Sequence, residues 1–306
     1  MNDFERRLSQ GVALHQQRRD GEALEIARQL LAYRCDEPRA LELLGVACVG
    51  TNRADLALQA VVRALATNPA LAEPAGCLGP ALRSLASAAF VLDRPSQEKH
   101  LWQWFESLRE DYLLTRPSPW FAFDAIDLLR RRLRPGLRIF EYGCGGSTLF
   151  WLESRPSSLV SIEHDEGWFR EMNTALGDSA VVDLRLVPPE PEPEATNADP
   201  ASPDAYRSSS PDFPAVSFRR YASQIDAFPD GHFDIVAIDG RARPSCIKHA
   251  HAKVRPGGLL VIDDADRGHY FARTRPFLEG YAMTRFDGVF PHLTFRCATA
   301  VGVRLG

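Results

Sequence analysis

The sequence lacks several features that would assign a protein to a compartment or to a class of partner. No apolar run is long enough to span a membrane, and the first ten residues, MNDFERRLSQ, are too charged for a signal peptide. The six cysteines form no C-x-x-C pair, so reduced thiols are the simplest interpretation. A basic excess is also missing, since the formal net charge is −4. We therefore expect a cytoplasmic protein that requires neither a membrane nor a nucleic acid as partner.

What is present is the composition of a globular protein. The chain has 306 residues, of which 45% are hydrophobic and 25% are charged. This length is sufficient for two domains, each with its own core.

The stretch that organises the chain is Leu137 to Leu152, LRIFEYGCGGSTLFWL. An apolar run typical of a strand meets a glycine-rich turn, and a helical pattern follows. Glycine permits positive φ and lets a ligand touch the backbone. The free N–H groups at the start of the following helix favour a polar or anionic group. We expect a nucleotide-like ligand at this turn.

Spacing separates two classes of nucleotide site. A dinucleotide fingerprint would place its third glycine at position 148, where this chain has Thr148. With the acid before the turn, E-Y-G-C-G-G-S-T resembles motif I of the class I S-adenosylmethionine-dependent methyltransferases. A tight connection without a ligand is the alternative. The cofactor-binding residues that the resemblance implies here are Glu141, Gly143, Cys144, Gly145, Ser147 and Thr148.

Residues 119–306 alternate between strand and helix patterns, which predicts a mostly parallel α/β sheet with helices on both faces. The resemblance to the methyltransferases covers this region and implies a Rossmann-like sheet of seven strands that ends in a reversed pair. The expected strands are Leu137–Tyr142, Leu159–Glu163, Val181–Val187, Phe233–Ile238 and Gly258–Ile262, with the reversed pair near Ala282–Phe286 and Leu293–Val303.

Acidic residues follow the predicted strands. Glu163 ends the second strand, 20 residues after Gly143, where an acid can accept both hydroxyls of a ribose; a helix cap is the alternative. His164 could contact adenine or be an exposed loop residue. Asp239 ends the fourth strand, at the edge where ligands bind such sheets, and could shape the cofactor pocket or act as a base.

A magnesium site is a further hypothesis. Asp239, Asp263 and Asp264 follow two strands and could converge on one hard cation. These positions resemble the metal-dependent O-methyltransferases of the macrocin type, which implies magnesium beside the acceptor hydroxyl. Alternatively, the pair Asp263-Asp264 caps the next helix. His269 is a candidate base or a surface residue. An acidic acceptor could be bound by Arg241, Arg243 and Arg267.

Residues 1–92 are rich in Ala and Leu with helical periodicity. Gly45 and Gly79 are 34 residues apart, the period of a tetratricopeptide repeat, so we expect an all-α tetratricopeptide-like domain, joined by a linker helix within residues 93–118. Stacked repeats could bind a peptide, a carrier protein or another protein partner. The alternative is a helical cap that shields the catalytic domain or forms a homodimer.

Residues 188–218 form an insertion rich in Pro, Glu and Ser. Such a composition cannot build a core, so a plain linker or disorder is expected, with a lid over the acceptor as the alternative.

Together these features predict transfer of a methyl group from S-adenosylmethionine to a nucleophile, most simply the oxygen of a small-molecule, carrier-bound or peptide-bound acceptor. A protein-modifying methyltransferase recruited through the repeats and a non-catalytic cofactor-binding scaffold are the two rival hypotheses.

Overall fold

The computed structural model describes residues 3–34, 37–51, 100, 103–104, 107, 117–193, 198–291 and 297–306. The chain divides into two compact units, Met1–Tyr112 with Gly288–Arg296, and Leu113–Asp287 with Cys297–Gly306. The predicted domain boundary near residue 92 and most of the predicted linker helix lie outside the described residues. No described helix is both long enough and apolar enough to cross a lipid bilayer.

Three helices build the described part of the first unit: α1 (Asp3–Gln16), α2 (Asp20–Tyr33) and α3 (Pro38–Gly50). Gly11 lies where they meet, since a Cβ there would overlap the Leu43 side chain and lie 3.1 Å from Ile26 Cγ2. A glycine is therefore needed for this close packing. Gly79 and the rest of residues 52–99 lie outside the described residues, and the tetratricopeptide-like domain stays a prediction.

The second unit is built on a seven-stranded sheet of order β3-β2-β1-β6-β7-β9-β8. Neighbouring strands from β3 to β7 pair in parallel, and β9 runs antiparallel to β7. The sheet confirms the predicted Rossmann-like architecture. Its strands are β1 (Arg138–Tyr142), β2 (Ser158–Glu163), β3 (Val182–Leu186), β6 (Phe233–Ile238), β7 (Val254–Ile262), β8 (Tyr281–Gly288) and β9 (Cys297–Arg304).

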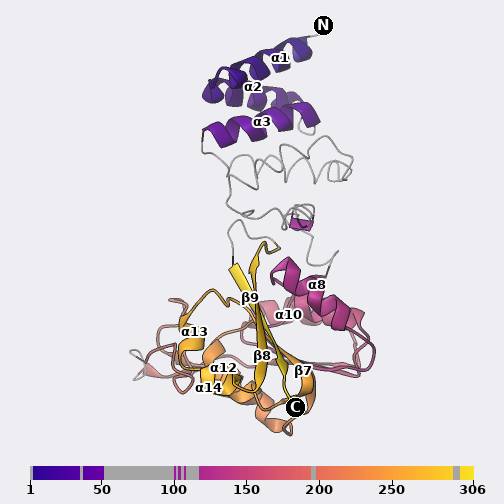
Figure 1. Ribbon diagram of the computed structural model, residues 1–306, viewed down its shortest axis with the longest axis vertical. Helices are drawn as coiled ribbons and strands as arrows, with labels where there is room; N and C mark the ends of the chain where they lie inside the picture. The colour runs from indigo at the N-terminus through magenta and orange to yellow at the C-terminus, as the bar shows by residue number, and fades with distance from the viewer. Residues whose placement is uncertain are drawn as a thin grey trace. The chain divides into compact units, whose positions relative to one another are not determined.

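Helices cover both faces of this sheet. In Figure 1, α8 and α10 lie on one side of the strands, and α12, α13 and α14 lie on the other. The central strands β1 and β6 are buried along most of their length, which is consistent with their largely apolar sequences. The helices are α8 (Phe123–Arg132), α9 (Gly146–Glu153), α10 (Glu166–Leu176), α11 (Arg219–Ala222), α12 (Arg243–Ala250), α13 (His269–Ala272) and α14 (Arg275–Leu278), with a 3₁₀ helix at Ser223–Ala227.

The start of β7 differs from the prediction. The strand begins at Val254, four residues before the predicted strand Gly258–Ile262, and its pairing with β6 is irregular there. Gly257 has φ +73°, and a Cβ on Gly258 would lie 2.8 Å from Asp234 O. Both glycines are needed for this local geometry.

The insertion is folded wherever it is described, so the expectation of a linker or of disorder was wrong there. Its ends pair as the short strands β4 (Glu190–Pro191) and β5 (Val216–Ser217). Arg207 is buried and donates hydrogen bonds to the carbonyls of Val216 and Pro214. Tyr206 is also buried. Composition was misleading because the insertion still buries the apolar side chains of Ala201, Tyr206 and Phe218, while Arg207 satisfies two backbone carbonyls.

Candidate functional site

The predicted site residues lie at one edge of the sheet, where the parallel strands end. Cross-strand backbone hydrogen bonds continue past the last residues of β1, β6 and β7 and fix the turns that follow. They run from Gly143 N to Ile162 O (2.8 Å), from Asp239 N to Tyr142 O (3.0 Å) and from Asp263 N to Ile238 O (3.1 Å). The structure therefore brings the glycine turn, Glu163 and the aspartates to the same edge, as ligand binding in such sheets requires.

The glycine turn packs against the end of β6. Gly143 has φ +91°, and a Cβ there would lie 3.1 Å from Asp239 O. Both facts demand glycine at this position. The backbone N–H of Cys144 donates to Glu163 Oε2 at 3.2 Å, and the N–H of Gly145 donates to Thr148 Oγ1 at 2.9 Å. The turn is thus fixed both to β2 and to its own helix.

Glu141 lies in the protein interior next to this turn. It is 1% exposed, and its carboxylate accepts hydrogen bonds from four side chains. Burial raises its pKa to about 7, against the opposing effect of these donors. Glu141 therefore holds the turn and α9, whereas a direct contact with a cofactor stays a prediction. The donors are Ser147, Thr148, Trp151 and Ser161.

Glu163 is held as an ion at the end of β2. Its Oε1 accepts hydrogen bonds from the backbone N–H groups of His164 (2.7 Å) and Asp165 (2.8 Å). Burial alone would raise its pKa, but the His164 ring and these N–H groups lower it below the ordinary value. His164 Nδ1 lies 2.7 Å from Oε1, so the ring and the ionised carboxylate are in direct contact.

The His164 ring is enclosed by aromatic residues and an arginine. Its Nε2 accepts a hydrogen bond from Arg241 Nε at 3.3 Å. Phe213 of the insertion contacts the ring at 5.4 Å between centroids and also lies 5.0 Å from the Arg241 guanidinium carbon. Phe218 and Tyr221 complete the enclosure at 5.9 and 6.3 Å. His164 is therefore not an exposed loop residue, and the insertion forms part of this edge.

The three aspartates of the magnesium hypothesis converge as predicted, but they surround an arginine. Arg243 Nη2 lies 2.8 Å from Asp239 Oδ1 and 3.6 Å from Asp263 Oδ2. Arg243 Nη1 forms an ion pair with Asp264. The guanidinium supplies the positive charge that the cation was expected to supply, so the arrangement does not support a magnesium site. Arg243 Nε is buried without a hydrogen-bond partner.

The three carboxyl groups differ in protonation. Burial raises the pKa of Asp263 well above its usual value, and the charge of Asp239 adds to the effect. Burial also leaves the pKa of Asp239 raised, although Arg243 opposes it. Asp264 behaves in the opposite way, because Arg243 and Arg267 outweigh burial and lower its pKa. The cluster therefore contains carboxyl groups that can hold a proton beside one that stays ionised.

His269, the second predicted catalytic residue, is exposed at the start of α13. The one contact that the structure records for its side chain is with the neighbouring Tyr270 ring, 4.5 Å between centroids. Tyr270, unlike His269, contacts the arginines of the aspartate cluster. Its hydroxyl accepts a hydrogen bond from Arg267 Nη1 at 2.9 Å and lies 3.4 Å from Arg243 Nη1. A catalytic role for His269 stays a prediction.

Sequence reasoning missed several residues of this edge. Trp168 donates from its indole N–H to Cys144 O at 2.8 Å. It occupies the third position of α10 after the N-cap Asp165, a spacing that could have signalled a side chain turned back toward the strand end. Tyr221 fills the space beside Gly240, where an added Cβ would overlap its hydroxyl. No local pattern identifies this long-range contact.

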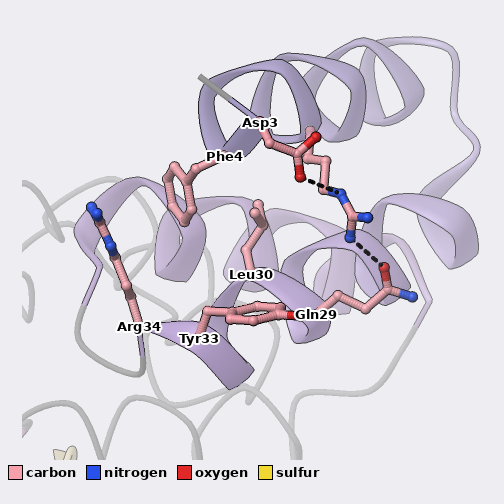
Figure 2. Close-up of a pocket in the computed structure, with 7 residues that line it drawn as sticks. Asp3, Phe4, Gln29, Leu30, Tyr33 and Arg34 are labelled. Atoms are coloured by element: carbon pink, nitrogen blue, oxygen red, sulfur yellow. Dashed lines mark hydrogen bonds and ion pairs between the residues drawn. The ribbon is translucent and has the colours of Figure 1, made fainter. Parts of the chain in front are cut away.

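A separate pocket lies on the N-terminal helices. Figure 2 shows the residues Asp3, Phe4, Gln29, Leu30, Tyr33 and Arg34 around it. Arg7 lies 3.3 Å from Asp3 Oδ2 and donates to Gln29 Oε1 at 3.4 Å. Binding of a partner by these helices stays a prediction.

Comparisons with known proteins give structural relatives alone, because no family model and no curated protein matches the chain. TrmN from Thermus thermophilus is similar at 16% identity and a TM-score of 0.39, over 59% of this chain and 48% of that chain. A methyltransferase-like protein from Silicibacter pomeroyi is similar at 21% identity and a TM-score of 0.40, over 62% of this chain and 90% of that chain. The tRNA (m1A58) methyltransferase TrmI from Aquifex aeolicus is similar at 13% identity and a TM-score of 0.41, over 64% of this chain and 76% of that chain.

This chain thus spans about half the length of TrmN. Identities this low concern the fold alone, so a function has to be argued from the side chains at the sheet edge.

Proposed function

We propose that the chain is an S-adenosylmethionine-dependent methyltransferase that methylates an oxygen of a small-molecule, carrier-bound or peptide-bound acceptor. One observation carries this proposal: the ionised Glu163 accepts a hydrogen bond from Cys144 of the glycine turn at the edge where Asp239 also lies. The glycine turn and Glu163 can hold the nucleoside, and Asp239 can act on the group that reacts beside it.

The residues present fit the cofactor. Glu163 is charged at neutral pH, and its Oε2 has Cys144 N as its recorded donor, so it can accept the ribose hydroxyls. The helix α9 begins at Gly146, and its first helical hydrogen bond is donated by Thr148 N to Gly145 O. The N–H groups of Gly146 and Ser147 precede this bond and favour the carboxylate of the methionine part.

The same geometry argues against a dinucleotide. At the place of the third fingerprint glycine, the Thr148 hydroxyl bonds to both Glu141 and Gly145 N. This side chain occupies the interface that the glycine would leave open for close packing of helix and strand.

The chemistry that this chain must supply is modest. When bound, S-adenosylmethionine provides an activated methyl group, so the protein mainly aligns the acceptor and removes its proton. Asp239 is the proposed base, because burial raises its pKa and makes it more basic than an ordinary aspartate. Arg243 holds this carboxylate at 2.8 Å and thereby fixes its orientation.

The direct test is calorimetric titration of the purified chain with S-adenosylhomocysteine and, separately, with NAD. We expect saturable one-to-one binding of S-adenosylhomocysteine and no measurable binding of NAD. Binding of NAD without binding of S-adenosylhomocysteine would refute the proposal.

A further inference from the structure

The turn between β6 and α12 carries two arginines whose surroundings are very different. Arg243 is neutralised by three aspartates. Arg241 forms no ion pair with any carboxylate among the residues that the structure describes; its recorded side-chain contacts are a hydrogen bond from Nε to His164 Nε2 and the stacking on Phe213. Arg241 is nevertheless half-buried. A partly desolvated cation thus lies at the site without a counter-charge.

The backbone explains why the two arginines separate. Ala242, between them, has φ +48°, a left-handed conformation that is uncommon for a residue other than glycine. Such strain persists where the surroundings hold it, and it clusters at functional sites. Here it coincides with Arg243 reaching the aspartates of β6 and β7 while Arg241 reaches His164 after β2.

Neither recorded neighbour of Arg241 compensates its charge. The His164 ring nitrogen accepts one hydrogen bond but carries no negative charge, and the Phe213 ring attracts the cation only weakly. The terminal Nη1 and Nη2 groups have no recorded hydrogen bond among the described residues, although a guanidinium fork pairs best with a carboxylate or a phosphate. Since the Arg241 side chain is half-buried and these terminal groups are not among the buried atoms without a partner, they remain accessible to an oxyanion.

We infer that Arg241 binds a carboxylate or phosphate group of the methyl acceptor, so that the acceptor is an anionic molecule. The inference rests on the proposed function and adds the chemical class of the substrate. Arg241 follows Asp239 by two residues and contacts His164, the neighbour of Glu163. An oxyanion on Arg241 therefore lies close to the proposed base, and it places the hydroxyl of the same molecule at the same edge.

Phe213 gives the insertion a part in this recognition. Its ring lies 5.0 Å from the Arg241 guanidinium carbon and 5.4 Å from the His164 ring centre. Stacking on one side leaves the edge of the guanidinium plane for bidentate hydrogen bonds. The insertion thus orients the arginine for an oxyanion.

The test uses inorganic phosphate as the probe, with ³¹P NMR line broadening measured on the whole chain at constant ionic strength. The variants are R241Q, R241K and the control R273Q, because Arg273 is 56% exposed in an ion pair with Asp199. We expect R241Q to bind phosphate about tenfold more weakly than wild type. R241K should lie between them, and R273Q should match wild type. Thermal unfolding of each variant verifies that it is folded.

A second arm identifies the molecule that carries the anion. If it is the acceptor, S-adenosylhomocysteine binds R241Q as tightly as wild type, and phosphate still binds the protein saturated with S-adenosylhomocysteine. The inference is overturned if R241Q binds phosphate as wild type does. It is also overturned if R241Q loses affinity for S-adenosylhomocysteine and this ligand displaces phosphate, because the anion would then be the carboxylate of the cofactor. Phosphate binding through Arg241 in a protein with no affinity for S-adenosylhomocysteine would refute the proposed function and leave the anion site standing.

Discussion

The guanidinium of Arg243 lies 2.8 Å from Oδ1 of Asp239, and the same group also pairs with Asp263 and Asp264. Its side chain is 10% exposed. Removal of a buried partner leaves its counter-charges uncompensated, which is far more costly than the loss of an exposed ion pair.

We therefore predict that R243M lowers the free energy of unfolding by about 3–5 kcal/mol at pH 7, measured by urea denaturation. R243K should recover part of the loss, because lysine restores the positive charge but not the planar set of donors of the guanidinium. The control is R273M, whose exposed pair with Asp199 should contribute less than about 1 kcal/mol. Equal losses in R243M and R273M would show that the cluster does not depend on Arg243.

Glu141 should make stability depend on pH. Its pKa is raised to about 7 in the folded protein, from an ordinary value of 4.5. Between these values the folded state holds a proton that the unfolded state has lost, so the free energy of unfolding falls as pH rises through this window. The difference is about 3 kcal/mol at one pKa unit per 1.36 kcal/mol.

The variant E141Q tests this relation, since an amide imitates the neutral acid and the hydroxyls of Ser161 and Thr148 can accept its N–H groups. We predict that the free energy of unfolding of E141Q, relative to that of wild type, rises by about 3 kcal/mol from pH 5 to pH 8. Parallel pH profiles for the two proteins would mean that Glu141 titrates near its ordinary pKa.

The sequence was sufficient to predict the sheet and the place of the site, but not the partners of the charged residues. Apolar runs and glycine spacing are local signals, and they located Gly143 and Glu163 at one sheet edge. The pairing of Asp239 with Arg243 is also close in sequence, at four residues. However, an aspartate cluster has the same sequence pattern whether a cation or an arginine neutralises it, so the two were indistinguishable.

The prediction that the insertion is a linker or disordered was wrong for a different reason. Its Pro, Glu and Ser content indicates a segment without a core of its own, yet Tyr206 and Arg207 are buried. Tyr206 contacts His249 of α12 and Arg219 of α11, so its buried surface is supplied by other elements. Composition within a segment cannot report contacts with residues far away in the sequence.

Gly240 and Tyr221 should be energetically coupled. A Cβ on Gly240 would overlap the Tyr221 hydroxyl and lie 3.2 Å from Gly143 N. We predict that G240A destabilises the protein by about 1–3 kcal/mol and that the added cost of G240A is smaller in a Y221F background, where the hydroxyl is missing. A double-mutant cycle in urea gives the coupling energy. Additive effects of the two substitutions would contradict the predicted overlap.

Arg207 should stabilise the folded conformation of the insertion. Its guanidinium donates to the carbonyls of Val216 and Pro214, so R207M leaves these acceptors without their donor. We expect limited proteolysis to cleave R207M within residues 188–218 several-fold faster than wild type, because local opening exposes the segment. The matched control is R220M, which removes a 66% exposed arginine paired with Glu190. Similar cleavage rates for R207M and R220M would show that Arg207 is not needed to keep the insertion folded.

The central claim is that S-adenosylmethionine binds over the glycine turn, with the ionised Glu163 accepting its ribose hydroxyls. The most direct test compares the dissociation constants of S-adenosylhomocysteine for wild type, E163Q and the control E166Q by titration calorimetry, since Glu166 is 64% exposed in the first turn of α10. Loss of charged hydrogen bonds to the ribose predicts binding to E163Q that is about 10- to 100-fold weaker, with E166Q equal to wild type. If a folded E163Q bound S-adenosylhomocysteine as tightly as wild type, the cofactor could not depend on this carboxylate and the account would be wrong.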